Sequence, residues 1–99
     1  MVHHIILWQL KDEIEDKETV KANIKTGLEG LSGQIPGLLK IHVQTETLAS
    51  ANADVMLDST FEDEDSLKGY AVHPAHVKVA DTFVRPFTAV RVCMDYKED

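Results

Sequence analysis

Apolar residues recur along this chain with two different periods, and the changes of period predict where strands and helices lie. Residues 2–10 read VHHIILWQL, a segment rich in β-branched and aromatic types, which predicts a strand. Both alternating faces of this strand are apolar, a pattern typical of a strand that is covered on both sides. One face would carry His4, Ile6, Trp8 and Leu10, and the other Ile5 and Leu7.

A first helix is predicted after the charged segment 11–16, with Asp16 as its N-cap. Helical spacing then joins four apolar residues into one stripe, which would face the core. Gly33 is the expected C-terminal stop, and Pro36 and Gly37 predict the turn that follows. The stripe consists of Val20, Ile24, Leu28 and Leu31.

Two further strands are predicted over residues 38–47 and 54–62, because apolar and polar positions alternate in both segments. In the first of them, Leu39, Ile41 and Val43 would share the buried face. Residues 49–53, between these two strands, are expected to form a loop.

A second helical region begins at the acidic run 62–65, since the positive end of a helix dipole favours acids. Pro74 disfavours helical geometry at His73, so the helix is expected to end there and a new one to begin at the proline. Pro86 is expected to close this second piece, and residues 87–96 then form the last strand.

The predicted order of elements is β-α-β-β-α-β, the split βαβ or ferredoxin-like plan of an α+β protein with a four-stranded antiparallel sheet. At 99 residues the chain is expected to form a single domain, residues 1–99, because smaller pieces would bury too little core. The helices of this plan cover one face of the sheet, and the other face here is still apolar. We therefore expect a symmetric homodimer in which a second copy covers it.

Composition narrows the classes of function. The formal net charge of −7 and the scattered basic residues argue against nucleic-acid binding. No segment approaches the roughly 20 apolar residues of a membrane span, and the short N-terminal apolar run lacks the features of a secretion signal. The single cysteine, Cys93, excludes an intrachain disulfide and suits the cytoplasm, where we expect the protein to reside. Its place in the last strand predicts an inert, buried thiol.

The segment GYAVHPAHVKVAD, residues 69–81, is the most distinctive part of the sequence. If Pro74 begins a helix, His76 lies in its first turn, where the positive potential of free N–H groups disfavours an imidazolium. A neutral His76 could act as a general base near pH 7. Tyr70 lies about one turn before the break, and its phenol could donate a hydrogen bond to a carbonyl or enolate oxygen.

Other interpretations of these residues stay open. A histidine at a helix end, such as His73, often serves only as a cap, and a tyrosine there often only packs. His73 and His76 with Asp81 have spacing that would suit a transition metal, but the proline between the histidines distorts it, and no metal site is expected. His4 would complete a pocket if its face of the strand looks toward the helices. Trp8 could line that pocket or belong to the core.

No cofactor is expected, because the sequence lacks the motifs that would hold a nucleotide. It contains neither GxGxxG nor the P-loop pattern. It also lacks the GxSxG elbow that would present a nucleophilic serine. The remaining chemistry is that of histidine and tyrosine side chains.

Two stretches, HHIILWQLKDEI near the start and GYAVHPAHVKVAD, together resemble the stress-responsive A/B barrel domain family. The resemblance extends over essentially the whole chain, and HPAH, residues 73–76, is its most specific part. It implies a dimeric α+β barrel, in which two ferredoxin-like subunits pack their sheets face to face. The family includes a cofactor-independent plant polyketide cyclase. Its basic histidine corresponds to His76 and its tyrosine to Tyr70. The histidine of its first strand, which lines the pocket, corresponds to His4, and the first histidine of its motif corresponds to His73.

The first hypothesis is therefore a homodimeric protein that binds a small carbonyl-bearing or aromatic molecule. In it, His76 removes a proton α to a carbonyl and Tyr70 stabilises the enolate, as in cyclase, lyase or isomerase chemistry without a cofactor. His4, His73 and Trp8 are expected to contact the molecule. One alternative is a non-catalytic ligand-binding or stress-related protein, and another is a cofactor-free monooxygenase-like enzyme.

Overall fold

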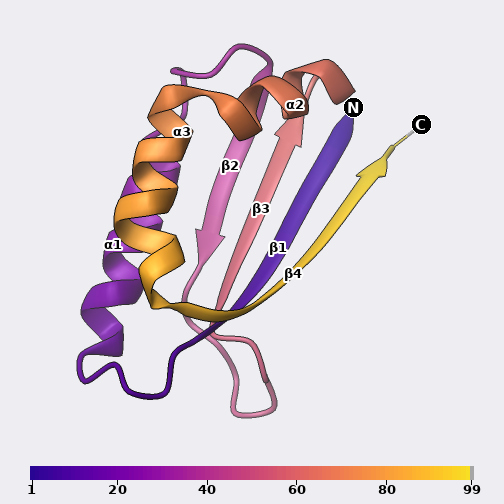
Figure 1. Ribbon diagram of the computed structural model, residues 1–99. Helices are drawn as coiled ribbons and strands as arrows, with labels where there is room; N and C mark the ends of the chain where they lie inside the picture. The colour runs from indigo at the N-terminus through magenta and orange to yellow at the C-terminus, as the bar shows by residue number, and fades with distance from the viewer. Residues whose placement is uncertain (99) are drawn as a thin grey trace.

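The computed structural model describes residues 1–98 and contains one antiparallel sheet with its helices on one side (Figure 1). The strands are β1 (Val2–Leu10), β2 (Leu38–Gln44), β3 (Val55–Phe61) and β4 (Thr88–Lys97). The helices are α1 (Lys17–Glu29), α2 (Glu64–Val72) and α3 (Pro74–Val79), and α3 continues as a π-helical turn η1 (Ala80–Val84) and a 3-10 turn η2 (Arg85–Phe87). The spatial order β2-β3-β1-β4 confirms the ferredoxin-like prediction.

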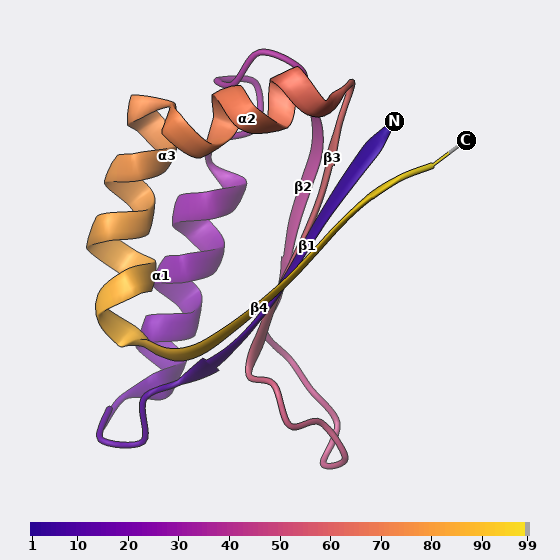
Figure 2. The same cartoon turned by 45° about the vertical axis from the view of Figure 1, so that its right-hand side comes forward.

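The inner face of β1 forms the centre of the core. Figure 2 shows all helices on one side of the sheet, and β1 lies between β3 and β4. The predicted face of β1, with His4, Ile6, Trp8 and Leu10, is buried, and so is Val2 on the same face. Leu7 on the other face is 39% exposed. Burial of one face only follows from the one-sided arrangement of the helices.

Helix α1 begins where the sequence predicts. The Asp16 carboxylate accepts a hydrogen bond from the Thr19 N–H at 3.0 Å, as an N-cap does. The predicted apolar stripe is buried. The helix ends at Glu29 rather than at Gly33, which lies farther along in the following turn with φ of +79°. The Glu29 carboxylate accepts from the Val43 N–H and so ties this end of α1 to β2.

Strand β2 departs from the predicted alternation near its start. Leu38 pairs with Phe61 and Lys40 with Thr60, so two residues of β2 stand opposite one of β3. Such a bulge shifts the alternation by one residue. Leu39 is therefore 50% exposed, and the prediction that it shares the buried face with Val43 is wrong.

The chain breaks at Pro74 as predicted. Asp63 caps α2 by accepting from the Ser66 N–H at 2.8 Å, and His73 has the extended geometry, φ −65° and ψ 132°, that separates α2 from α3. Helical structure continues through Pro86, which lies within η2 where its missing N–H costs no hydrogen bond. Across residues 1–98, none of the helices combines the length and apolarity required to cross a bilayer.

No helix covers the outer face of the sheet (Figure 2). This face carries exposed apolar side chains. Leu7 pairs with Val92 and Ile5 with Met94, and residues directly opposite on antiparallel strands share a face. Val92 is 57% exposed and Met94 is 65% exposed. Together these neighbouring residues form one apolar patch, the outer apolar face, rather than isolated exposed side chains. Such a patch is typical of an interaction surface.

Candidate functional site

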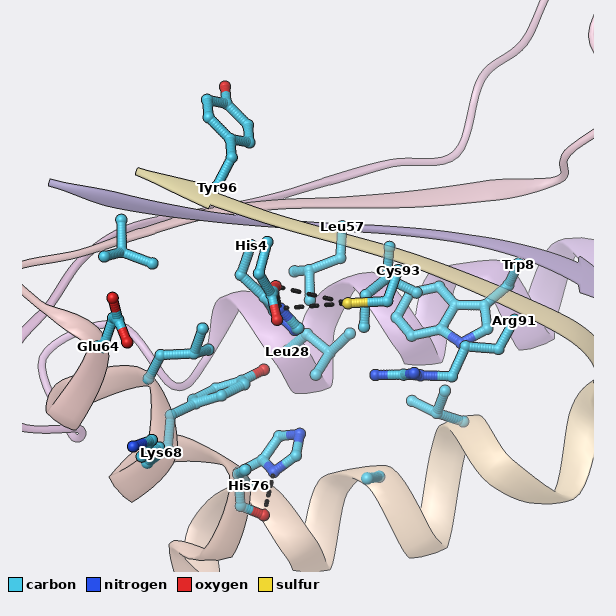
Figure 3. A pocket seen from close by; sticks show the side chains of 18 of the residues that line it. His4, Trp8, Leu28, Leu57, Glu64, Lys68, His76, Arg91, Cys93 and Tyr96 are labelled. Carbon is cyan, nitrogen blue, oxygen red and sulfur yellow. Dashed lines mark hydrogen bonds and ion pairs between the residues drawn. The ribbon is translucent and has the colours of Figure 1, made fainter. Parts of the chain in front are cut away.

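A cavity of about 780 Å³ lies between the inner face of the sheet and the helices that follow β3. Figure 3 shows His4, Trp8 and Cys93 on the sheet side of this cavity and His76 on the helix side. Its size falls within the range of small-molecule sites. Much of the wall is apolar and comes from Val2, Ile6, Leu28, Leu57, Leu67 and Val84.

His76 stands on α3 with its ring toward the cavity (Figure 3). Its Nδ1 lies 3.4 Å from the carbonyl oxygen of Ala71, a long hydrogen bond in which Nδ1 carries the proton. Nε2 then keeps its lone pair. Burial lowers the pKa of His76, and the Arg85 and Arg91 charges lower it further. The expected neutral imidazole is thus favoured by burial, whereas the prediction attributed it to the helix terminus.

Tyr70, on α2, is 1% exposed, and its hydroxyl has no hydrogen-bond partner among residues 1–98. Its ring lies between that of Phe61, 5.1 Å away between centroids, and that of His76, 4.1 Å away. Burial raises the pKa of Tyr70 well above its usual range. The phenol therefore stays protonated at the cavity wall and has a donor to offer.

His4 lies on the inner face of β1, which looks toward the helices. This is the orientation in which His4 is expected, from the sequence, to complete the pocket. It is 7% exposed, and its Nδ1 is hydrogen-bonded to the Asp95 carboxylate on β4. Its ring centroid is 6.1 Å from that of Tyr70, in an edge-to-face arrangement. Trp8, two positions beyond Ile6 on the same face, also lines the cavity.

His73 is the one expected site residue that the structure does not bring to the cavity. Its Nδ1 accepts a hydrogen bond from the Ala75 N–H at 3.1 Å and so caps the start of α3. This bond holds the break between α2 and α3, and the break in turn sets the positions of Tyr70 and His76. His73 thus has the capping role that the sequence left open.

Cys93 was expected to be buried, and the structure shows that it is exposed. It belongs to β4, which is an edge strand, so only β1 flanks it within the sheet. Its Sγ lies 3.4 Å from Oδ1 of Asp95 and 3.8 Å from Nδ1 of His4. Partial desolvation by its neighbours raises the pKa of the Cys93 thiol although the residue is exposed, and the Asp95 carboxylate raises it further, so the thiol stays protonated.

The cavity wall has more basic than acidic side chains, although the whole chain carries a net charge of −7. Sequence reasoning missed this because the basic residues are far apart along the chain. It also missed Asp95, although its spacing of two from Cys93 places both on one strand face. The basic residues are Lys68, Arg85, Arg91 and Lys97, and the acidic ones are Glu64 and Asp95.

Solved structures of other proteins share this fold. A dimeric protein of unknown function from Bacteroides fragilis, with a ferredoxin-like fold, is 30% identical with a TM-score of 0.90, over 98% of this chain and 95% of that one. A hydroxynitrile lyase from Passiflora edulis is 18% identical with a TM-score of 0.71, over 96% of this chain and 90% of that one. The second likeness, at such low identity, concerns the fold alone.

This chain is also similar in sequence to a known protein and to a protein family. The stress-response A/B barrel domain-containing protein HS1 of Arabidopsis thaliana is 32% identical over 100 residues, which cover 97% of this chain and 88% of that protein. The stress responsive A/B barrel domain family matches residues 2–98. These matches confirm the family resemblance that the sequence predicted. The chain belongs to the stress responsive A/B barrel domain family.

Proposed function

We propose that this protein binds a small carbonyl-bearing or aromatic molecule in the cavity and that His76 and Tyr70 act on it by acid–base chemistry without a cofactor. The observation that carries this proposal is the Tyr70 hydroxyl, which is buried at the cavity wall with no hydrogen-bond partner in residues 1–98. An unsatisfied buried hydroxyl costs about 1–3 kcal/mol. A ligand oxygen that accepts this hydrogen bond would recover that free energy.

The proposed step is removal of a proton from the carbon next to a carbonyl. The C–H bond breaks, the proton goes to Nε2 of His76, and the electron pair becomes an enolate with its charge on oxygen. The Tyr70 O–H donates to that oxygen and stabilises the charge as it forms. The enolate then regains a proton, forms a new bond or expels a leaving group, which are isomerase, cyclase and lyase outcomes.

The remaining cavity residues would select and orient the molecule. Trp8 and the apolar wall offer contact for an aromatic or alkyl portion. His4 lies beside Tyr70 and is held by Asp95, so it can serve as a fixed polar contact. A hydroxynitrile lyase has the same fold, so this fold is compatible with the lyase outcome proposed above.

The working unit in this proposal is a homodimer. The outer apolar face of the sheet, which includes Leu7, Val92 and Met94, would be covered by the same face of a second copy. The similar protein from Bacteroides fragilis is dimeric, which supports this arrangement. The cavity lies on the opposite side of the sheet, so pairing of the two sheets leaves it accessible.

Hydrogen–deuterium exchange at carbon tests the proposed chemistry without knowledge of the natural substrate. The protein is incubated in D₂O with two probes, a β-keto thioester and an aryl ketone, and α-deuteration is followed by NMR. We expect exchange above the buffer rate and a loss of at least about 100-fold in His76→Gln, the scale of general-base removal. Lys78→Gln, an exposed position on the same helix, is the matched control.

The fluorescence of Trp8 measures binding separately from catalysis in the same samples. It is the only tryptophan and lines the cavity, so its fluorescence reports occupancy. Saturable quenching by a probe that undergoes no exchange would support the non-catalytic binding protein instead. Exchange that persists in His76→Gln would overturn the assignment of the base.

A further inference from the structure

We propose that His4, Cys93 and Asp95 form a binding site for a divalent transition-metal ion of the zinc class, on the sheet side of the cavity. Each residue presents one potential ligand atom, and the three atoms lie within 4.8 Å of one another. They come from the neighbouring strands β1 and β4, and Figure 3 shows His4 and Cys93 together on the sheet side of the cavity. Neither His76 nor Tyr70 belongs to this site, so its failure would leave the proposed acid–base function untouched.

Two of the three distances between the ligand atoms are close to those around a tetrahedral ion. With bonds of about 2.3 Å to sulfur and about 2.0–2.1 Å to nitrogen or oxygen, a tetrahedral zinc holds its ligand atoms about 3.3–3.6 Å apart. Sγ of Cys93 lies 3.4 Å from the Asp95 oxygen and 3.8 Å from the His4 nitrogen. The His4 and Asp95 atoms are in direct hydrogen-bond contact and would have to separate. The Asp95 side chain is 45% exposed, which leaves it room to move.

The sheet fixes the three positions through its register. His4 stands directly opposite Asp95 in the pairing of β1 with β4, and Cys93 lies two residues from Asp95 on the same face. Ser59 of β3 secures His4 from the other side, because its hydroxyl donates to the His4 carbonyl oxygen at 2.9 Å. Two of the ligands would therefore be set by strand pairing rather than by a flexible loop.

The set of donor atoms selects the class of ion. One imidazole nitrogen, one sulfur and one carboxylate oxygen suit zinc and similar borderline ions, whereas calcium and magnesium require oxygen ligands. Three protein ligands leave a fourth position of a tetrahedral ion open, as in catalytic rather than structural zinc sites. Because the cluster lines the cavity, that position would face the space into which His76 points from the other side.

Pairing of two copies through the outer face of the sheet does not close this site. The three side chains lie on the inner face, opposite the outer apolar face that would form the interface. The ion would therefore reach the cluster through the cavity in the monomer and in the dimer alike. Its binding can be measured on the full chain without dissociating any assembly.

Cobalt(II) is the probe for this site, because a thiolate bound to it gives a charge-transfer absorption band and a four-coordinate ion gives intense visible bands. The reduced full chain is titrated with Co²⁺ alone in a non-chelating buffer and then with Zn²⁺ as competitor. We expect one Co²⁺ per chain, a charge-transfer band that is absent in Cys93→Ser, and displacement by Zn²⁺. Since loss of an outer-shell partner costs 10–100-fold in affinity, loss of the ligand in Asp95→Asn should cost at least about 100-fold.

Two variants distinguish this site from other histidines and from misfolding. His42→Gln, on β2 at the far edge of the sheet, should bind Co²⁺ as the wild type does. Asp95 is exposed, so Asp95→Asn should keep its far-ultraviolet circular dichroism even if a variant of buried His4 does not. Absence of a sulfur band in the wild type, or full affinity in Asp95→Asn, would overturn the proposal.

Discussion

The imidazole of His76 lies against the phenol ring of Tyr70, with centroids 4.1 Å apart and ring planes inclined by 35°. The two residues come from helices on either side of the break at Pro74, so the break brings them together. Burial acts on them in opposite senses, since it lowers the pKa of the imidazole and raises that of the phenol. A neutral proton acceptor and a protonated donor are thereby held side by side, which is the arrangement that enolate chemistry requires.

Tyr70→Phe should separate stability from function. The hydroxyl has no partner in residues 1–98, so its removal relieves an unsatisfied group, and the free energy of unfolding should stay the same or rise. Exchange of the ketone probes should nevertheless fall by about 10²–10³, the usual effect of removing one oxyanion donor. Thermal melts and the NMR exchange assay measure the two quantities on one sample.

The opposite pattern would contradict this account of Tyr70. A melting temperature several degrees lower in Tyr70→Phe would show that the hydroxyl already has a stabilising partner. Unchanged exchange together with unchanged stability would show that the phenol takes no part in the chemistry. Phenylalanine keeps the ring contacts with Phe61 and His76, so packing is matched between the two proteins.

Acidification should destabilise the protein partly through His76. Its pKa in the folded state is lowered by burial, so between its ordinary value of about 6.5 and the lowered value the unfolded chain binds more protons than the folded one. Stability must then fall as pH decreases through this window. His76→Gln should show a smaller loss than the wild type between pH 7 and pH 5 in denaturant unfolding.

The groups that act on His76 define the controls for this pH dependence. Arg85, Arg91 and His4 all disfavour its protonated form electrostatically. Arg91→Gln should therefore make the loss of stability on acidification slightly smaller, because the folded-state pKa of His76 moves back toward its ordinary value, while Lys78→Gln should leave the loss unchanged. A wild-type protein that gains stability through His76 on acidification would contradict this account, because it would require a folded-state pKa raised above the ordinary value, as a neighbouring carboxylate would cause.

The sequence predicted the elements because their signals are local. The apolar stripe of α1, the cap at Asp16 and the break at Pro74 each depend on residues within one or two turns of each other. The bulge that exposes Leu39 was missed, because it arises from pairing with β3 rather than from the residues of β2 alone. Periodicity within one strand carries no information about an extra residue opposite its neighbour.

Spacing in the sequence indicates which residues of the candidate site contact each other only where they belong to one segment. Tyr70 and His76 lie six positions apart, and the proline between them indicates how they meet. His4 and Asp95 are 91 positions apart, and their contact depends on the strand order β3-β1-β4 and on the register of β1 with β4. Long-range pairing of this kind is fixed by the whole fold, so spacing in the sequence could not indicate it.

Two glycines in helices should respond in opposite ways to alanine. A Cβ at Gly27 would lie 2.9 Å from Cγ1 of Val79 and 3.2 Å from the Phe83 ring, where α1 packs against the helix after Pro74. Overpacking costs about 1–3 kcal/mol, and the better helix propensity of alanine returns at most about 1 kcal/mol. Gly27→Ala should therefore lower the free energy of unfolding.

Gly69→Ala is the matched control for that substitution. Gly69 lies in α2 with nothing within 4 Å of its would-be Cβ, so propensity alone should raise the free energy of unfolding by about 0.5–1 kcal/mol. Urea unfolding of both variants measures the difference. Equal stabilisation by both would show that α1 and α3 are farther apart than the contacts at Gly27 indicate.

Met94→Glu should convert the proposed homodimer into monomers. Met94 is 65% exposed on the outer apolar face and pairs with Ile5, so a symmetric interface would bury it twice, once in each copy. Burial of two unpaired carboxylates in an apolar contact is strongly unfavourable, and the dimer should dissociate while the cavity side stays intact. Sedimentation equilibrium should give twice the chain mass for the wild type and for Met94→Leu, and the single chain mass for Met94→Glu. A monomeric wild type, or a Met94→Glu protein that remains dimeric, would place the interface elsewhere or remove it.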